Sequence, residues 1–132
     1  RRIASAIVRQ RRISPISTTG QLAAIVLKAI PRKPGRQGIH PATRVFQALR
    51  IYCNRELDQL QELLEGLAGW IVPGGRLAFI TFHSLEDRLV KHFFRDSREF
   101  TGTSPAWRKP SDVEIRVNSR SRSAKLRTGV RS

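Results

Sequence analysis

The chain has 132 residues, of which 25 are Lys or Arg and 10 are Asp or Glu, so its formal net charge is +15 at pH 7. Hydrophobic residues make up 39% of it, which suits one domain with a modest core and excludes a disordered tail. No apolar run reaches the roughly 18 residues of a membrane helix, and no secretory signal pattern is present. The single cysteine, Cys53, excludes an internal disulfide and a thiolate zinc site. Met is absent even at position 1, which predicts a piece of a longer protein.

Two helices are predicted first. Residues 2–10 carry apolar side chains at helical spacing. Thr18, with Gln21 three residues later, is a capping-box pattern that opens a second helix through Ile30. Residues 31–38 (PRKPGRQG) then form a basic Pro/Gly loop that is well placed to contact phosphate.

One long helix is predicted next, over residues 42–68, with Pro41 suited to its first turn. Its leucines recur every three or four residues, and Cys53 lies on the same apolar stripe. We therefore expect Cys53 to be a small buried hydrophobe. Trp70, at the end of this apolar helix, is expected to pack in the core.

A strand and another helix follow the turn at residues 73–75 (PGG). Residues 76–82 (RLAFITF) are short and rich in β-formers, which predicts a buried strand, and residues 85–96 show helical spacing. Helix, turn, strand and helix together predict an α/β crossover from the later part of a doubly wound sheet. The remaining expectations are a short strand near Trp107, a basic loop over 116–122 and a closing strand over 123–130.

The charge is unevenly distributed along the chain. All ten acidic residues lie between Glu56 and Glu114, so the stretches on either side carry only positive side chains. Two basic ends around a nearly neutral middle favour contact with a polyanion, RNA or DNA. Neither end has the aromatic-faced amphipathic helix that favours a membrane surface. Solubility, or a partner domain with an acidic face, would explain the same charge.

Three long motifs, in this order along the chain, resemble the RsmH (MraW) family. The first is HPATR at 40–44 with FQALRI at 46–51, the second is PGGRL at 73–77 with FHSLEDR at 82–88, and the third is RSRSAKLR at 120–127. The family methylates the exocyclic N4 of a cytosine in small-subunit ribosomal RNA, with S-adenosylmethionine (SAM) as methyl donor. The family's usual Asn-Pro-Arg is here Asn118-Ser119-Arg120.

The resemblance implies an α/β fold: the C-terminal part of a Rossmann-like SAM-dependent methyltransferase plus part of an inserted helical domain. Residues 1–40 would be the end of that inserted domain, and residues 41–132 the last part of the methyltransferase domain. The family's SAM site lies in an N-terminal half, in a Gly-rich loop after the first strand. Here the only Gly pair, Gly74-Gly75, precedes a strand, so we expect no cofactor-binding residue in this chain and no activity from it alone. The resemblance also implies a cytoplasmic protein whose partner is small-subunit ribosomal RNA or the 30S-type subunit, and it leaves a homodimer open.

His83 and Glu86 are the candidate catalytic residues. They follow the predicted strand 76–82, and the site of an open α/β sheet lies beyond the carboxyl ends of its strands. His83 would contribute to the cytosine pocket, and Glu86 or Asp87 would accept a proton from the amine. The structural alternative is a cap in which Ser84 pairs with Asp87, and a solvated Glu86 in the first helical turn.

Five basic residues are the candidate RNA contacts. Arg44 lies on the predicted long helix, whereas Arg120, Arg122, Lys125 and Arg127 alternate with small residues, a spacing that suits phosphate contacts. A solvated helix side and a solvated basic tail are the alternatives. Trp107 is a candidate for stacking on an unpaired base.

No metal site is expected, because His40 and His92 are far apart in the sequence and from carboxylate partners. A non-catalytic RNA-binding module derived from such an enzyme is the second functional hypothesis, and a dimerisation piece is a third. The predicted strand 76–82 argues against a stand-alone module, since it needs neighbouring strands that the chain is not expected to supply.

Overall fold

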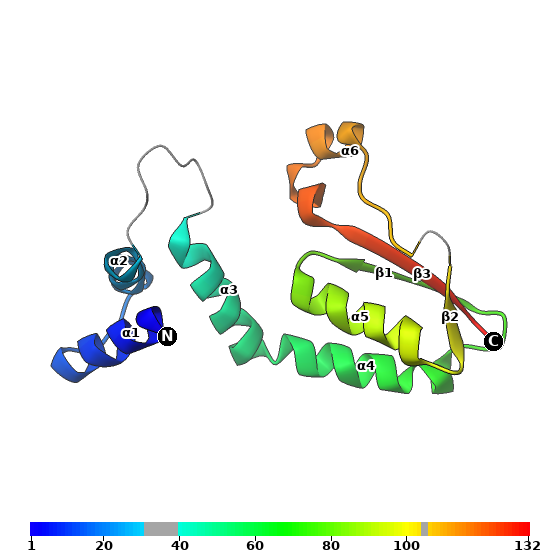
Figure 1. Cartoon of the computed structure of the whole chain (residues 1–132), viewed down its shortest axis with the longest axis horizontal. Helices are drawn as coiled ribbons and strands as arrows, with labels where there is room; N and C mark the ends of the chain where they lie inside the picture. Colours follow the sequence, from blue (N-terminus) through cyan, green and yellow to red (C-terminus); the bar gives the residue numbers. More distant parts are fainter. Residues whose placement is uncertain (31–39, 104–105) are drawn as a thin grey trace. The chain divides into compact units, whose positions relative to one another are not determined.

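Figure 1 shows the computed structural model, which describes residues 1–30, 40–103 and 106–132. The chain divides into two compact units, Arg1–Asn54 and Arg55–Ser132. The predicted basic loop at 31–38 lies outside the described residues. Among the helices of the described ranges, none is both long and apolar enough to span a bilayer.

The first unit is helical, with α1 (Arg2–Ile13), α2 (Thr19–Ala29) and α3 (Pro41–Asn54). The predicted capping box at α2 is confirmed: the Gln21 amide donates to Thr18 Oγ1 at 3.2 Å, and the Thr18 amide donates to Gln21 Oε1 at 3.1 Å. α2 packs against both α1 and α3, and Val26 of α2 is completely buried. The two predicted N-terminal helices are therefore present.

The prediction of one long helix is wrong, because the helix is interrupted at Arg55. This residue has a φ of 54°, in the left-handed region, and it separates α3 from α4 (Glu56–Trp70). A left-handed residue that is not glycine costs roughly 1–2 kcal/mol, and the Arg55 guanidinium compensates in part with a 3.1 Å ion pair to Asp58. Cys53, predicted to be buried, is exposed on the last turn of α3.

The second unit combines helices with a three-stranded sheet. Its elements after α4 are β1 (Arg76–Thr81), α5 (Ser84–Asp96), β2 (Phe100–Gly102), α6 (Asp112–Val117), a 3-10 helix η1 (Ser119–Ser123) and β3 (Lys125–Arg131). The predicted closing strand is confirmed as β3. The predicted basic loop at 116–122 is wrong, since α6 and η1 occupy it. In place of the short strand predicted near Trp107, the described residues there form an isolated bridge between Arg108 and Leu126.

The sheet has the strand order β1-β3-β2, with β3 antiparallel to both neighbours. β1 and β2 therefore run parallel to each other, with α5 between them in the chain and the last strand between them in the sheet. The prediction of a crossover in a doubly wound sheet is corrected to this extent: both strand pairings in this sheet are antiparallel. The expectation that the chain supplies no partner strand for β1 is wrong, because the C-terminal residues turn back to pair with it. On its other edge β1 has no partner within the described part of the chain.

The core lies between this sheet and the helices α4 and α5, which lie on the same side of it (Figure 1). β1 alternates: Leu77 and Thr81 are buried toward α5, whereas Ile80 on the opposite face is 63% exposed. The strand is thus half-buried, which corrects the prediction of a fully buried one. Trp70, also expected in the core, is 65% exposed. The central cluster consists of Leu64, Leu67, Leu77 and Phe100, with Phe79, Phe93 and Phe94 packed against it.

Candidate functional site

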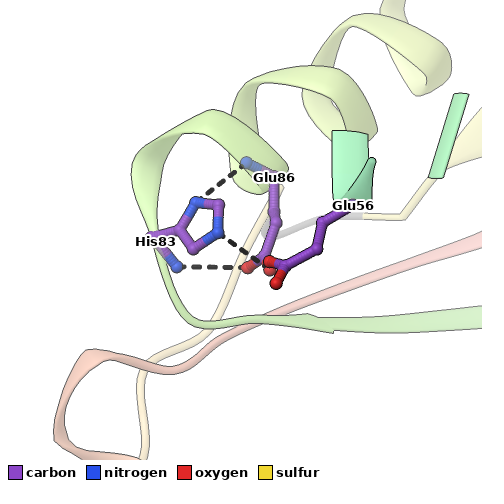
Figure 2. Close-up of side chains that lie close together, drawn as sticks. All are labelled: Glu56, His83 and Glu86. Atoms are coloured by element: carbon purple, nitrogen blue, oxygen red, sulfur yellow. Dashed lines mark hydrogen bonds and ion pairs between the residues drawn. The ribbon is translucent and has the colours of Figure 1, made fainter. Parts of the chain in front are cut away.

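The turn between β1 and α5 is built around His83, which is the N-cap of α5. Its Nδ1 accepts the Glu86 amide at 3.4 Å, while Glu86 Oε2 accepts the amides of Phe82 at 2.9 Å and His83 at 3.2 Å (Figure 2). The two side chains therefore form a reciprocal capping box at the carboxyl end of β1. The predicted cap by Ser84 and Asp87 is wrong by one residue, because a histidine nitrogen takes the place of the usual hydroxyl oxygen.

Glu56, from the first turn of α4, joins this pair (Figure 2). One ligand-type atom from each of Glu56, His83 and Glu86 lies within 4.8 Å of the others. His83 Nε2 is 3.0 Å from Glu86 Oε1, and the imidazole side chain is only 11% exposed. Nε2 is fully buried and has no hydrogen-bond partner of good geometry among the described residues. The cluster thus links the first turns of α4 and α5.

An imidazole and two carboxylates also have the composition of a divalent-cation site. Two features argue against that use. Nδ1 accepts the Glu86 amide, so in a neutral ring the proton is on Nε2, and the nitrogen that faces the carboxylates is a donor and not a metal ligand. The amino terminus of α5 also carries a positive partial charge that favours anions. Nε2 instead lies 3.0 Å from Glu86 Oε1, beside the carboxylate but without hydrogen-bond geometry.

Asp87, one residue further along α5, is buried and paired with β3. Arg127 contacts it through both carboxylate oxygens, with Nε 2.7 Å from Oδ1 and Nη2 3.2 Å from Oδ2. Lys125 Nζ is 2.9 Å from Oδ2. The hydrogen bond from Arg127, followed by that from Lys125, lowers the pKa of Asp87 below its usual 3.8, although burial opposes the shift.

The structure separates the predicted RNA-binding residues. Arg127 is buried, and its guanidinium also donates to the Ala106 carbonyl oxygen at 2.9 Å. Its guanidinium is therefore engaged in contacts within the protein. Lys125 is partly exposed. Arg120 and Arg122 are exposed on η1, and Arg44 is exposed on α3 of the first unit. The alternation with small residues predicted four equivalent phosphate contacts over residues 120–127. Two of these four residues, Lys125 and Arg127, instead pair with Asp87.

Trp107 lies next to two lysines, one of which, Lys125, is a predicted RNA contact. The ammonium of Lys125 is 5.2 Å from the centroid of its ring, and that of Lys109 is 5.5 Å away. Both contacts are cation–π interactions, which hold the indole and the positive charges together at the surface. Its predicted role in stacking on a base stays a prediction.

Sequence reasoning missed Glu56 and the partner of Asp87. Glu56 was hidden inside the predicted long helix, although a Glu that begins a helix is a normal first-turn acid. The pairing of Asp87 with Arg127 spans 40 residues, and no local pattern carries such a contact.

Comparison with known proteins identifies relatives for almost the whole chain. The family model described as "MraW methylase family" matches residues 1–131. Proteins named "Ribosomal RNA small subunit methyltransferase H" are 54% identical over 132 residues in Synechococcus sp. (strain JA-3-3Ab) and 53% identical over 131 residues in Cyanothece sp. (strain PCC 7425 / ATCC 29141). One from Rhodopirellula baltica is 47% identical over 132 residues. These alignments cover 100%, 99% and 99% of this chain, and 42%, 43% and 40% of the relatives' lengths.

Proposed function

This chain belongs to the MraW methylase family, and on that premise we propose that it is part of an enzyme that transfers a methyl group from SAM to the exocyclic N4 of a cytosine in small-subunit ribosomal RNA. The observation that carries the proposal is the match over residues 1–131 together with relatives at about half identity that are named small-subunit ribosomal RNA methyltransferases. The chain spans only about two fifths of the length of those relatives, so the activity belongs to the longer protein.

We further propose that the second unit is the C-terminal part of a Rossmann-like methyltransferase fold. Three observations support this: β1 and β2 are parallel and joined through α5, both α4 and α5 lie on one face of the sheet, and the outer edge of β1 has no partner within the described ranges. That edge is where a further strand would pair. Residues 1–40 would be the end of an inserted helical domain, although the first compact unit continues to Asn54.

The Gly pair of this chain does not have the features of a SAM-binding loop. The only Gly pair precedes β1 and uses its amides internally: Gly74 donates to the Arg131 carbonyl oxygen and Gly75 to that of Val72, each at 2.9 Å. A Cβ on Gly75 would lie 2.5 Å from Ile71, so this turn is packed and leaves no room for a ligand. We therefore propose that SAM binds to a part of the protein outside this chain.

Positioning is the main requirement of methyl transfer, because a weakly nucleophilic amine must attack the methyl carbon in line with the bond to the departing sulfur. His83 and Glu86 lie at the carboxyl end of β1, where the site of such a sheet is expected. Contact of His83 with the cytosine and proton acceptance by Glu86 stay predictions. The contacts described above support a positioning role, because the box fixes the turn that begins with Phe82.

For RNA binding we propose phosphate contacts from the exposed Arg44, Arg120 and Arg122, with Lys125 shared between Asp87 and solvent. The position of Arg127 supports an internal role instead. Phosphate contacts of this kind fix the register of RNA without reading its sequence.

The decisive experiment incubates the complete gene product with SAM and with small subunits from cells that lack the gene. Nucleoside analysis of the RNA should then show N4-methylcytidine at one position, and no product when SAM is omitted. Methylation of a different atom would overturn the proposed chemistry. RNA binding without any transferred methyl group would favour the non-catalytic module.

A further inference from the structure

A second feature lies on the face of the sheet opposite α5. It is a cavity of about 550 Å³ bounded by the end of β1, the segment before α6, α6 itself, η1 and the start of β3. Its volume lies in the range of roughly 300–1,000 Å³ typical of small-molecule sites.

The floor of this cavity is apolar. Ile80 of β1 is paired with Leu126 of β3, and alternation along both strands places the two side chains on the face that α5 does not cover. Phe82 continues the same row and is 51% exposed. Ile80 and Phe82 are exposed and Leu126 is partly buried, and the three together form an apolar surface suited to a flat ligand.

The rim is positive. Arg108, Lys109 and Arg120 all line the cavity and are exposed, against one carboxylate, that of Glu114. The surrounding segments add Trp107 with its two ammonium neighbours. A flat apolar floor with cations around it matches the chemistry of an unpaired nucleotide, in which a base stacks and a phosphate pairs with Arg or Lys.

We propose that this cavity binds one unpaired nucleotide of the RNA substrate, with the base against Ile80, Phe82 and Leu126 and the phosphate at Arg120. This inference rests on the proposed function, since it assigns a position to the RNA of that reaction. Phe82 immediately precedes His83, so the bound nucleotide lies beside the capped turn at the carboxyl end of β1. SAM does not match the rim, because its sulfonium and ammonium outweigh its single carboxylate and leave it cationic.

The charge part of the proposal is tested with two substitutions, Arg120→Gln on η1 and Arg116→Gln on α6. Both arginines are exposed and carry the same charge, but only Arg120 lines the cavity. In the complete gene product, Arg120→Gln should weaken binding of a short single-stranded RNA with the substrate's sequence by about tenfold in fluorescence anisotropy, the loss of one charged contact. Arg116→Gln should change it less than about twofold. Equal losses for the two variants would overturn the proposal, because they would indicate general attraction of RNA by charge.

The apolar part is tested with Ile80→Asn against Val117→Asn. Both side chains are largely exposed, so neither change should unfold the protein, but Val117 lies outside the cavity lining. Ile80→Asn should weaken RNA binding, and an RNA with 5-iodocytidine should crosslink to the peptide that contains Phe82. Unchanged binding by Ile80→Asn, or crosslinks only elsewhere, would overturn the proposal.

Methylation by the wild-type protein in the same preparations separates this inference from the proposed function. Normal methylation with no difference in RNA binding between Arg120→Gln and Arg116→Gln would reject the cavity alone. Absence of methylation by the wild type would reject the proposed function.

Discussion

Asp87 and Arg127 form a two-point ion pair that joins the first turn of α5 to the middle of β3. The pair holds the amino terminus of α5, and with it the turn at His83, against the last strand of the chain. The C-terminal residues therefore do more than close the sheet: their register sets the place of the candidate site.

The first prediction concerns this pair. Arg127→Ala should lower the free energy of unfolding by about 3–5 kcal/mol, because it leaves the buried Asp87 carboxylate with Lys125 as its remaining cationic partner. Urea denaturation of the complete gene product measures the change. Arg122→Ala, on the exposed surface of η1, should shift the midpoint very little. A small loss for Arg127→Ala would show that Lys125 alone satisfies the carboxylate.

The second prediction is a pH dependence with a definite sign. Because the pKa of Asp87 is lowered in the folded protein, chiefly by Arg127, the unfolded chain binds more protons between the folded and unfolded pKa values. The stabilisation is therefore fully present above the usual value of 3.8 and is lost as the pH falls through the lower folded value. Unfolding measured against pH should show a shallower acid limb for Asp87→Asn than for the wild type. Parallel acid limbs would contradict the assignment.

The third prediction separates the two roles of His83. Asn is a good N-cap but cannot provide an imidazole, so His83→Asn should keep the stability of α5, whereas His83→Ala should lose about 1 kcal/mol. A purely positioning role predicts that methylation by His83→Asn stays close to that of the wild type. A stable His83→Asn protein with little methylation would instead assign chemistry to the ring. Thermal unfolding and methylation rates, measured on the same preparations, distinguish these outcomes.

Local signals in the sequence predicted local structure well. The Thr18 box, the 73–75 turn, α5 and the closing strand were all predictable, because each depends on residues within a few positions of one another. The break at Arg55 was not, since the apolar spacing continues through it and no Gly or Pro marks it. Its positive φ lies where the chain passes from one compact unit to the next.

The candidate site was predictable in place but not in arrangement. The motif placed His83 and Glu86 at the carboxyl end of a strand, and the structure has them there. The third member of the cluster, Glu56, and the engagement of Asp87 by Arg127 come from contacts between distant elements. Spacing along the chain could not separate buried from exposed arginines, because burial is decided by which face of β3 meets α5.

The last prediction concerns the close approach of α5 to the face of β3 that it covers. Gly129 of β3 lies under Phe94, and a Cβ there would lie far inside van der Waals contact of Phe94 Cε1. Gly129→Ala should therefore push α5 away from the sheet and destabilise the protein by about 1–3 kcal/mol. Gly69→Ala is the matched control: it lies in α4 with nothing within 4 Å of the new Cβ, so it should be neutral or stabilise by up to about 1 kcal/mol. Phe94→Leu should recover part of the loss in the double variant with Gly129→Ala, since the clash is with the ring itself. Urea unfolding of the wild type, Gly129→Ala, Phe94→Leu and the double variant forms a double-mutant cycle. Strict additivity of the changes in unfolding free energy at positions 94 and 129 would contradict a direct contact.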